Sequence, residues 1–213
     1  MKTDDLVSLL AADAAPVPRR AASQRLAMAL LISLPLSFAW MAFEHGVRRD
    51  LLQALFWPMF WVKLIFPACI AAAGFVIVQR LARPGVRVRS AWMGLAVPIL
   101  ALWVLAVVAW FVAPQDERLA MIWGQTWRVC TFNIAVISVP VFVAALATLK
   151  TLAPTQPALA GAAAGAMAGG AGAAVYALHC TELAAPFLAI WYVVGIAVPV
   201  VAGAAIGHRL LRW

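Results

Sequence analysis

Six apolar stretches, each long enough to cross a lipid bilayer as a helix, dominate this chain of 213 residues. About 20 helical residues span the roughly 30 Å hydrocarbon core of a membrane. Hydrophobic residues make up 66% of the chain, charged residues 11%, and the mean hydropathy is +0.96, which excludes a soluble domain. The predicted spans are Leu26–Phe43, Phe56–Leu81, Ala91–Ala113, Val129–Leu149, Ala158–Leu178 and Pro186–His208.

These spans predict an all-α protein, a six-helix transmembrane bundle. Apolar and polar residues do not alternate with a period of two, which argues against a barrel, and helices satisfy their own backbone hydrogen bonds in lipid. The first residues include Asp4 and Asp5 and no apolar stretch follows at once, so a cleaved signal peptide is not expected. We expect two parts, a head and linker over residues 1–25 and the membrane domain over residues 26–213.

Lysine and arginine are unevenly divided between the two sides of the predicted bundle. Eleven of the sixteen lie on the side of the termini and five on the other side. Because cytoplasmic segments retain basic residues, both termini are predicted to lie in the cytoplasm. The net charge of +8 then reflects topology, so we expect contact with membrane lipid and no direct contact with nucleic acid.

Glycines recur at four-residue spacing in the fifth span, at Gly161, Gly165 and Gly169. Small residues at this spacing let another helix approach closely. The last span carries a similar pair, Gly203 and Gly207. We expect the partner helix to belong to the same chain; the alternative is a homo-oligomer formed through the same face.

Charged residues inside the spans are few. Lys63 lies near the outer end of the second span, where we expect its side chain to reach the lipid headgroups. No acidic residue lies deep in any predicted span. Since transport of ions or protons usually leaves ionisable residues at that depth, the pattern disfavours a transporter.

The N-terminal head predicts a short cytoplasmic amphipathic helix. Thr3 can cap it, and Asp4 and Asp5 would lie beside the positive end of its dipole. An apolar stripe follows, made of Leu6, Leu9 and Leu10. So short a helix either lies on a membrane or docks into a partner's groove. Because membrane-surface helices usually carry basic residues, docking to a cytoplasmic protein is preferred, and a loosely ordered tail is the alternative.

Two of the three cysteines lie at span ends on the side opposite the termini. Cys130 begins the fourth span, and Cys180 follows the fifth, directly after His179. Two nearby thiols in an oxidising compartment could form a disulfide. Alternatively, Cys130, Cys180 and His179 offer soft donors for transient binding of a thiophilic metal ion, with Glu182 or His45 as further ligands. Thiols that simply pack are the third alternative; no resident cofactor is expected.

Three stretches resemble the NrsF-type family of bacterial membrane anti-sigma factors, the negative regulators of sigma F. They are the opening TDDLVSLLAADAAPV, the stretch WRVCTFN around Cys130, and the terminal HCTELAAPFLAIWYVVGIAVPVVAGAAIGHRLLRW. The resemblance covers nearly the whole chain and implies a six-helix protein. It further implies that the chain holds an extracytoplasmic-function sigma factor at the inner membrane and releases it under heavy-metal or oxidative stress.

The resemblance also implies roles for individual residues. The two periplasmic cysteines needed for the response would be Cys130 and Cys180. The sigma-docking segment would include Asp4, Asp5, Leu6, Leu9 and Leu10. Cys69 receives no role, and we expect it to pack inertly inside the second span.

Two alternative functions are a membrane thiol–disulfide redox protein and a small-molecule transporter. The first usually relies on closely spaced cysteine pairs, and no C-x-x-C occurs in the chain. The second is disfavoured by the missing charges at mid-membrane depth. A hydrolytic enzyme is not expected, because His45, His179 and His208 are divided between the two sides.

Overall fold

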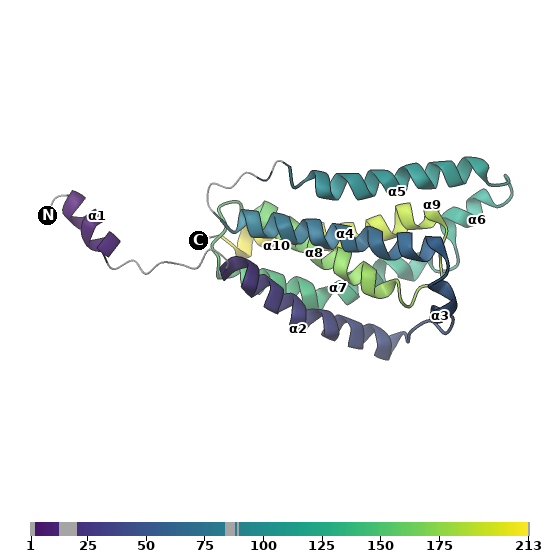
Figure 1. Cartoon of the computed structure of the whole chain (residues 1–213), viewed down its shortest axis with the longest axis horizontal. Helices are drawn as coiled ribbons and strands as arrows, with labels where there is room; N and C mark the ends of the chain where they lie inside the picture. Colours follow the sequence, from purple (N-terminus) through teal and green to yellow (C-terminus); the bar gives the residue numbers. More distant parts are fainter. Residues whose placement is uncertain (1–2, 13–20, 84–87, 89, 213) are drawn as a thin grey trace.

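The fold consists of six long helices lying side by side, seen in a computed structural model that describes residues 3–12, 21–83, 88 and 90–212 (Figure 1). No strand occurs among these residues, so the predicted all-α class is confirmed. The long helices are α2 (Ala21–Glu44), α4 (Pro58–Leu81), α5 (Met93–Val112), α7 (Trp127–Lys150), α8 (Pro157–Tyr176) and α10 (Val193–Leu210).

Short helices join the long ones at one end of the bundle. These are α3 (Leu51–Ala54), α6 (Arg118–Trp123) and α9 (Ala185–Phe187), with a turn of π-helix over Leu188–Tyr192 between α9 and α10. The start of α2 and the end of α10 lie at the opposite end (Figure 1). Six passages therefore return the chain to the end of the bundle where it began. A separate helix, α1 (Thr3–Ala12), precedes them in the sequence.

Among the residues that the structure describes, six apolar helical segments are long enough to cross a membrane, in agreement with the six predicted spans. The fourth is much longer than the sequence suggested. It runs from Arg118 to Lys150, because α6 and α7 form one apolar segment. The remaining five match the predicted spans to within a few residues at each end.

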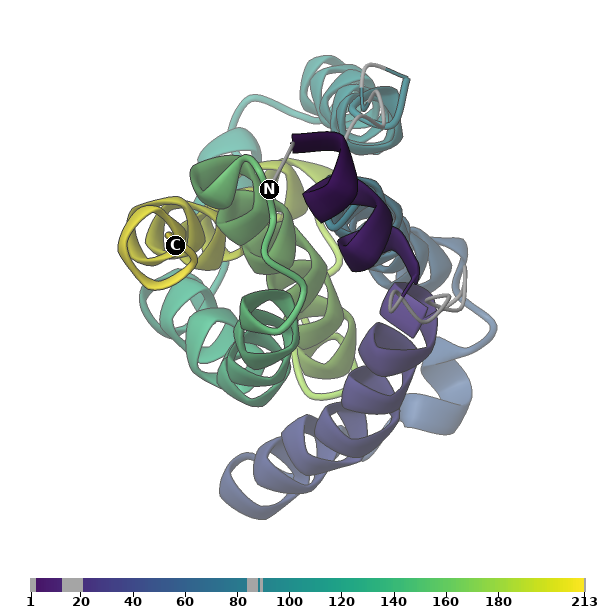
Figure 2. The same ribbon diagram turned by 90° about the vertical axis from the view of Figure 1, so that its left-hand side faces the viewer.

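Helix α8 lies at the centre of the bundle. Its main contacts are with α10, α4 and α7. The view along the bundle shows α8 (green) surrounded by these helices, with α5 and α2 at the periphery (Figure 2). Nearly all its residues from Ala160 to Ala173 are buried. A helix of alanine and glycine fits this position because small side chains let three neighbouring backbones approach it at once.

The glycine pattern of α8 is explained by its contact with α10. A Cβ atom on Gly161 would overlap the backbone carbonyl of Gly203, and one on Gly165 would overlap that of Pro199. Gly169 also faces α10, with Ile196 Cα 3.1 Å from the position of a Cβ. The expected packing within one chain is therefore confirmed. Within the chain, α10 covers this glycine face of α8.

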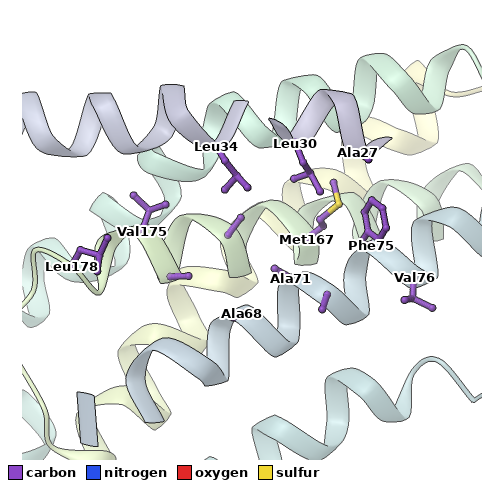
Figure 3. A pocket seen from close by; sticks show the side chains of 13 residues that line it. Ala27, Leu30, Leu34, Ala68, Ala71, Phe75, Val76, Met167, Val175 and Leu178 are labelled. Carbon is purple, nitrogen blue, oxygen red and sulfur yellow. The ribbon is translucent and has the colours of Figure 1, made fainter. Parts of the chain in front are cut away.

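Helix α2 is attached to the bundle mainly along α7 and makes fewer contacts with α8 and α4. A cavity of about 640 Å³ lies between α2, α4 and α8 (Figure 3). Apolar side chains line it, among them Leu30, Phe75 and Met167. Such a lining suits contact with lipid tails, which offer no hydrogen-bonding partners.

Candidate functional site

The connection between α8 and α9, residues 177–184, brings the two predicted thiols together. Cys180 lies in this connection, where its backbone N–H donates to the Tyr176 carbonyl at 3.0 Å. Cys130 lies in the first turn of α7, where its N–H donates to the Thr126 carbonyl at 2.9 Å. Because α7 begins and α8 ends at the same end of the bundle, the two residues meet there (Figure 1).

The side chains of Cys130 and Cys180 are in hydrogen-bond contact and are not bridged. Their exposed fractions are 0% and 2%. The sequence left open whether the two helices are neighbours, and the structure answers that they are. Two thiols in contact can be joined by oxidation or can bind one soft cation together.

Lys63 reaches this thiol pair from α4. Its Nζ donates to the carbonyl oxygens of Cys180 at 2.6 Å and of Glu182 at 2.7 Å. The same atom contacts the Cys180 side chain and lies 5.4 Å from the centre of the Tyr192 ring. Lys63 is fully buried, so the expectation that it reaches the lipid headgroups is wrong. Hydrogen bonds to buried carbonyls compensate the lost hydration, which makes the interior position tolerable.

Arg48 supports the connection from the segment between α2 and α3. Its guanidinium forms two hydrogen bonds with Asp50, at 2.8 and 2.7 Å, and a longer one of 3.4 Å to the Cys180 carbonyl. The hydrogen bond to Asp50 raises the pKa of Arg48, and the same hydrogen bond lowers the pKa of Asp50. Arg48 also lies over the rings of Trp57 and Phe60, at 5.7 and 5.9 Å. Its charge is thereby fixed close to the thiol site.

The environment of Cys180 favours its thiolate. The hydrogen bond from Cys130, followed by the charge of Lys63, lowers the pKa of Cys180, while burial acts in the opposite direction. The backbone N–H of Glu182 adds a hydrogen bond to the same sulfur. Thiolates are the nucleophilic and metal-binding form of cysteine. Of the two thiols, Cys180 is therefore the one with the cationic and hydrogen-bonding partners of a reactive cysteine.

Two tyrosines close the site on its inner side. Tyr176 ends α8, and its ring centre lies 6.3 Å from that of Tyr192 in the π-helical turn. Tyr192 is fully buried, and its hydroxyl contacts the Cys180 side chain. Single π-helical turns within α-helices are frequent at functional sites.

Glu182 and its neighbours fix the far side of the connection. The Glu182 carboxylate accepts a hydrogen bond of 2.6 Å from the backbone N–H of Gln125. Gly124 before it adopts a φ of +52°, and a Cβ there would lie 2.7 Å from the Phe187 ring. Nearby, the Trp191 Nε1 donates to the Ile122 carbonyl at 2.9 Å. The turn before α7 is thus attached to the segment that follows Cys180.

The histidines that were considered as metal ligands lie close by but are otherwise engaged. His179 Nδ1 is 2.9 Å from the Gly46 carbonyl, and its ring centre is 5.2 Å from that of His45. Within residues 3–12, 21–83, 88 and 90–212, no three His, Cys, Asp or Glu side chains form a group that could hold a metal ion. The donors that fit a thiophilic cation here are the sulfurs of Cys130 and Cys180.

Cys69 lies in α4, away from the thiol pair. It is exposed on the outside of the bundle, so the expectation that it packs inside is wrong. Of the predicted docking residues, Asp4 and Asp5 are exposed in the first turn of α1. The remaining three lie in α1, but their side chains are outside the described structure; they are Leu6, Leu9 and Leu10.

Sequence reasoning missed three residues that contact the thiol site: Lys63, Arg48 and Tyr192. A signal for Lys63 existed, because a lysine within an apolar span usually faces a polar partner inside the protein. Its partners are carbonyls 117 and 119 residues away, which no local pattern reveals. For Arg48 and Tyr192 no sequence signal was available, since their contacts depend on how the helices are arranged.

Comparison with known proteins gives full-length matches. The family described as NrsF, negative regulator of sigma F, matches residues 10–213. A protein of Azospira oryzae named probable anti-sigma-F factor NrsF is 44% identical over 213 residues, covering all of both chains. The anti-sigma-F factor NrsF of Caulobacter vibrioides is 38% identical over 218 residues, again covering both chains completely. No solved structure matches.

Proposed function

The chain belongs to the NrsF family of negative regulators of sigma F, and we propose that it is an inner-membrane anti-sigma factor controlled by its paired thiols. As a member of this family it is a regulatory protein and not an enzyme. In the proposal, the N-terminal segment holds an extracytoplasmic-function sigma factor. Reaction of Cys130 and Cys180 with heavy metals or oxidants in the periplasm causes its release.

The positions of the thiol pair and of the N-terminal segment at opposite ends of the bundle support separate roles for them. Six apolar helices fit a membrane protein, and the start of α2 lies at the end opposite the thiol pair (Figure 1). The excess of lysine and arginine on the side of the termini favours the cytoplasm for that end. Sulfur chemistry and sigma binding would then occur on opposite sides of the membrane.

The proposed docking element is residues 1–25, with α1 as its helical part. Asp4 and Asp5 lie in the first turn of α1, where acidic residues stabilise a helix. Leu6, Leu9 and Leu10 follow at the spacing of one helix face, as in helices that bind a partner's groove. A helix of ten residues is marginal alone, so binding would supply much of its stability.

The contact between Cys130 and Cys180 is the observation that carries the sensing proposal. The pair is unbridged and buried, and Cys180 has Lys63 and the Glu182 N–H beside its sulfur. Either oxidation to a disulfide or binding of a soft cation would replace the thiol–thiol contact by a new bond. No third protein ligand is required for such a change.

The energy required of the switch is moderate. To turn a partner from 99% bound to 99% released, the signal must weaken binding by about 5.5 kcal/mol. Zinc binding at structural sites with four protein ligands supplies about 10–16 kcal/mol. A fraction of that free energy, transmitted through the bundle, is sufficient.

Two sets of variants in the full-length protein test the proposal. Cys130→Ser with Cys180→Ser should leave the sigma factor co-purifying with the membrane protein but abolish its release by cadmium, with Cys69→Ser as the matched control. Leu6→Asp with Leu10→Asp should abolish co-purification, with Ser8→Asp as control, because Ser8 is exposed on α1. A normal cadmium response in the double serine variant would refute the sensing role. Intact binding in the double aspartate variant would refute the docking role.

A further inference from the structure

Lys63 connects the thiol pair to α4 through one atom. Its Nζ contacts the sulfur of Cys180 and donates to the Cys180 and Glu182 carbonyls, at 2.6 and 2.7 Å. An ammonium group has three donors, so these three contacts use all of them. No water-exposed surface is left on the side chain. The connection 177–184 is therefore held to α4 by the same group that touches the sulfur.

The other side chains that hold this connection do not contact both the Cys180 sulfur and the backbone carbonyls. Arg48 donates to the Cys180 carbonyl at the longer distance of 3.4 Å, and its main partner is Asp50. The Glu182 carboxylate accepts from Gln125 and His179 lies against the Gly46 carbonyl. Of the described side chains, Lys63 is the one with hydrogen bonds to both the sulfur of Cys180 and the carbonyls of the connection.

We propose that Lys63 is a positioning residue that holds residues 177–184 against α4 while the thiols are reduced and lets them move when the Cys180 sulfur reacts. This inference rests on the proposed sensing function for its biological meaning. The Cys180 thiolate accepts a hydrogen bond from Nζ strongly, because the bond is charge-assisted, whereas a neutral thiol accepts one weakly. A disulfide sulfur is neutral and a poorer acceptor, so its formation leaves the buried Lys63 with one partner fewer.

Loss of that partner has a defined consequence. A buried amine or ammonium that loses a hydrogen bond is strongly disfavoured, which drives either the lysine or the connection to a new position. The backbone N–H of Glu182, which also donates to the Cys180 sulfur, loses the same acceptor. Movement of the connection would be passed to α8 on one side and to α9 and α10 on the other, since it joins them.

Amide hydrogen exchange of residues 177–184 in the full-length protein tests this role. The thiols are joined with diamide, whose azo group takes up the two hydrogens that the two thiols lose as the sulfur–sulfur bond forms. In the parent, joining the thiols should accelerate exchange at Glu182 by about tenfold, the signature of a local opening. In Lys63→Met, exchange should be fast before oxidation and change by less than about twofold afterwards. Lys63→Arg should restore the response of the parent.

The controls distinguish a specific role from general destabilisation. Lys150→Met makes the same substitution at an exposed lysine at the other end of the bundle and should behave as the parent. If Lys63→Met does not fold, Lys63→Gln replaces it with the same expected result. A full tenfold response in the Lys63 variant would overturn the proposal. So would a parent whose connection exchanges at the same rate before and after oxidation.

The outcome is independent of the sigma factor, which takes no part in the assay. A parent protein that shows the opening but does not release sigma with oxidant would refute the proposed function and leave the role of Lys63 standing. A protein that releases sigma without any opening at residues 177–184 would refute the role of Lys63 and leave the proposed function standing.

Discussion

Replacing Gly165 by alanine should destabilise the bundle, because the added methyl group has no space between α8 and α10. It would overlap the Pro199 carbonyl and lie 2.6 Å from Val200 Cα, whereas carbon atoms normally approach to about 3.5–4.0 Å. Both contacts are with backbone, which cannot rotate aside, so α10 must shift as a whole.

The magnitude follows from two opposing effects. Overpacking of this kind costs about 1–3 kcal/mol, and backbone overlap favours the upper end of that range. Alanine gains about 1 kcal/mol over glycine in helix propensity. The net loss is about 2 kcal/mol, which for a chain of this size lowers the melting temperature by roughly 4–8 °C.

The assay is thermal unfolding followed by circular dichroism in one detergent. Gly94→Ala is the matched control. Gly94 lies on the outer helix α5, and among the described residues a methyl group there meets only Ala73 of α4, whose Cβ is 3.0 Å away. This variant should melt within a few degrees of the parent. The close-approach argument would be refuted if Gly165→Ala melted at or above the temperature of Gly94→Ala.

Two further predictions concern the surroundings of the thiol site, and a third concerns Cys69, which lies away from it. The hydrogen bond from Arg48 lowers the pKa of Asp50 in the folded protein. The ion pair therefore stabilises the fold fully above the carboxyl's unfolded pKa of about 3.9, and this stabilisation is lost as the pH falls through the lower pKa of the folded state. The melting temperature should therefore be higher for the parent than for Asp50→Asn at pH 7, and this difference should shrink as the pH falls below about 3.9. A difference that stays constant as the pH falls would contradict the assignment. Gly124→Ala should lower the free energy of unfolding by about 1–3 kcal/mol, because Gly124 has a positive φ and an added Cβ would overlap the Glu182 carboxylate. It should also speed amide exchange at the following residue. Unchanged melting and exchange would show that the turn is not constrained. Cys69→Ser should melt like the parent, since its side chain is exposed, and a large drop in melting temperature would mean that it is packed.

The helices were predictable because their signals are local. Length and hydropathy identify a membrane span without reference to its neighbours, so all six were found. The face of α8 that meets α10 was also predictable, because the four-residue spacing of Gly161 and Gly165 marks it directly. The start of the fourth span differs from the prediction, because the short apolar helix α6 precedes α7 where the sequence predicted a connection.

The thiol site was predictable only in part, because its contacts join distant segments. Cys130 and Cys180 could be assigned to the same side of the membrane, but a separation of 50 residues gives no information on whether their helices touch. The position of Lys63 was misjudged for a physical reason. Distance from the end of the span was used as the criterion, whereas two backbone carbonyls in the α8–α9 connection determine where the side chain lies.

The one-sided attachment of α2 has a consequence for how this molecule could respond. Among the spans, α2 is the one that follows the N-terminal segment directly in sequence, and the cavity beside it leaves its α4 and α8 side without close-packed protein. A helix attached mainly along one neighbour can change its tilt at little energetic cost, whereas α8 and α10, packed through their glycines, must move together. A rearrangement at the thiol end of the bundle would therefore most readily change the tilt of α2.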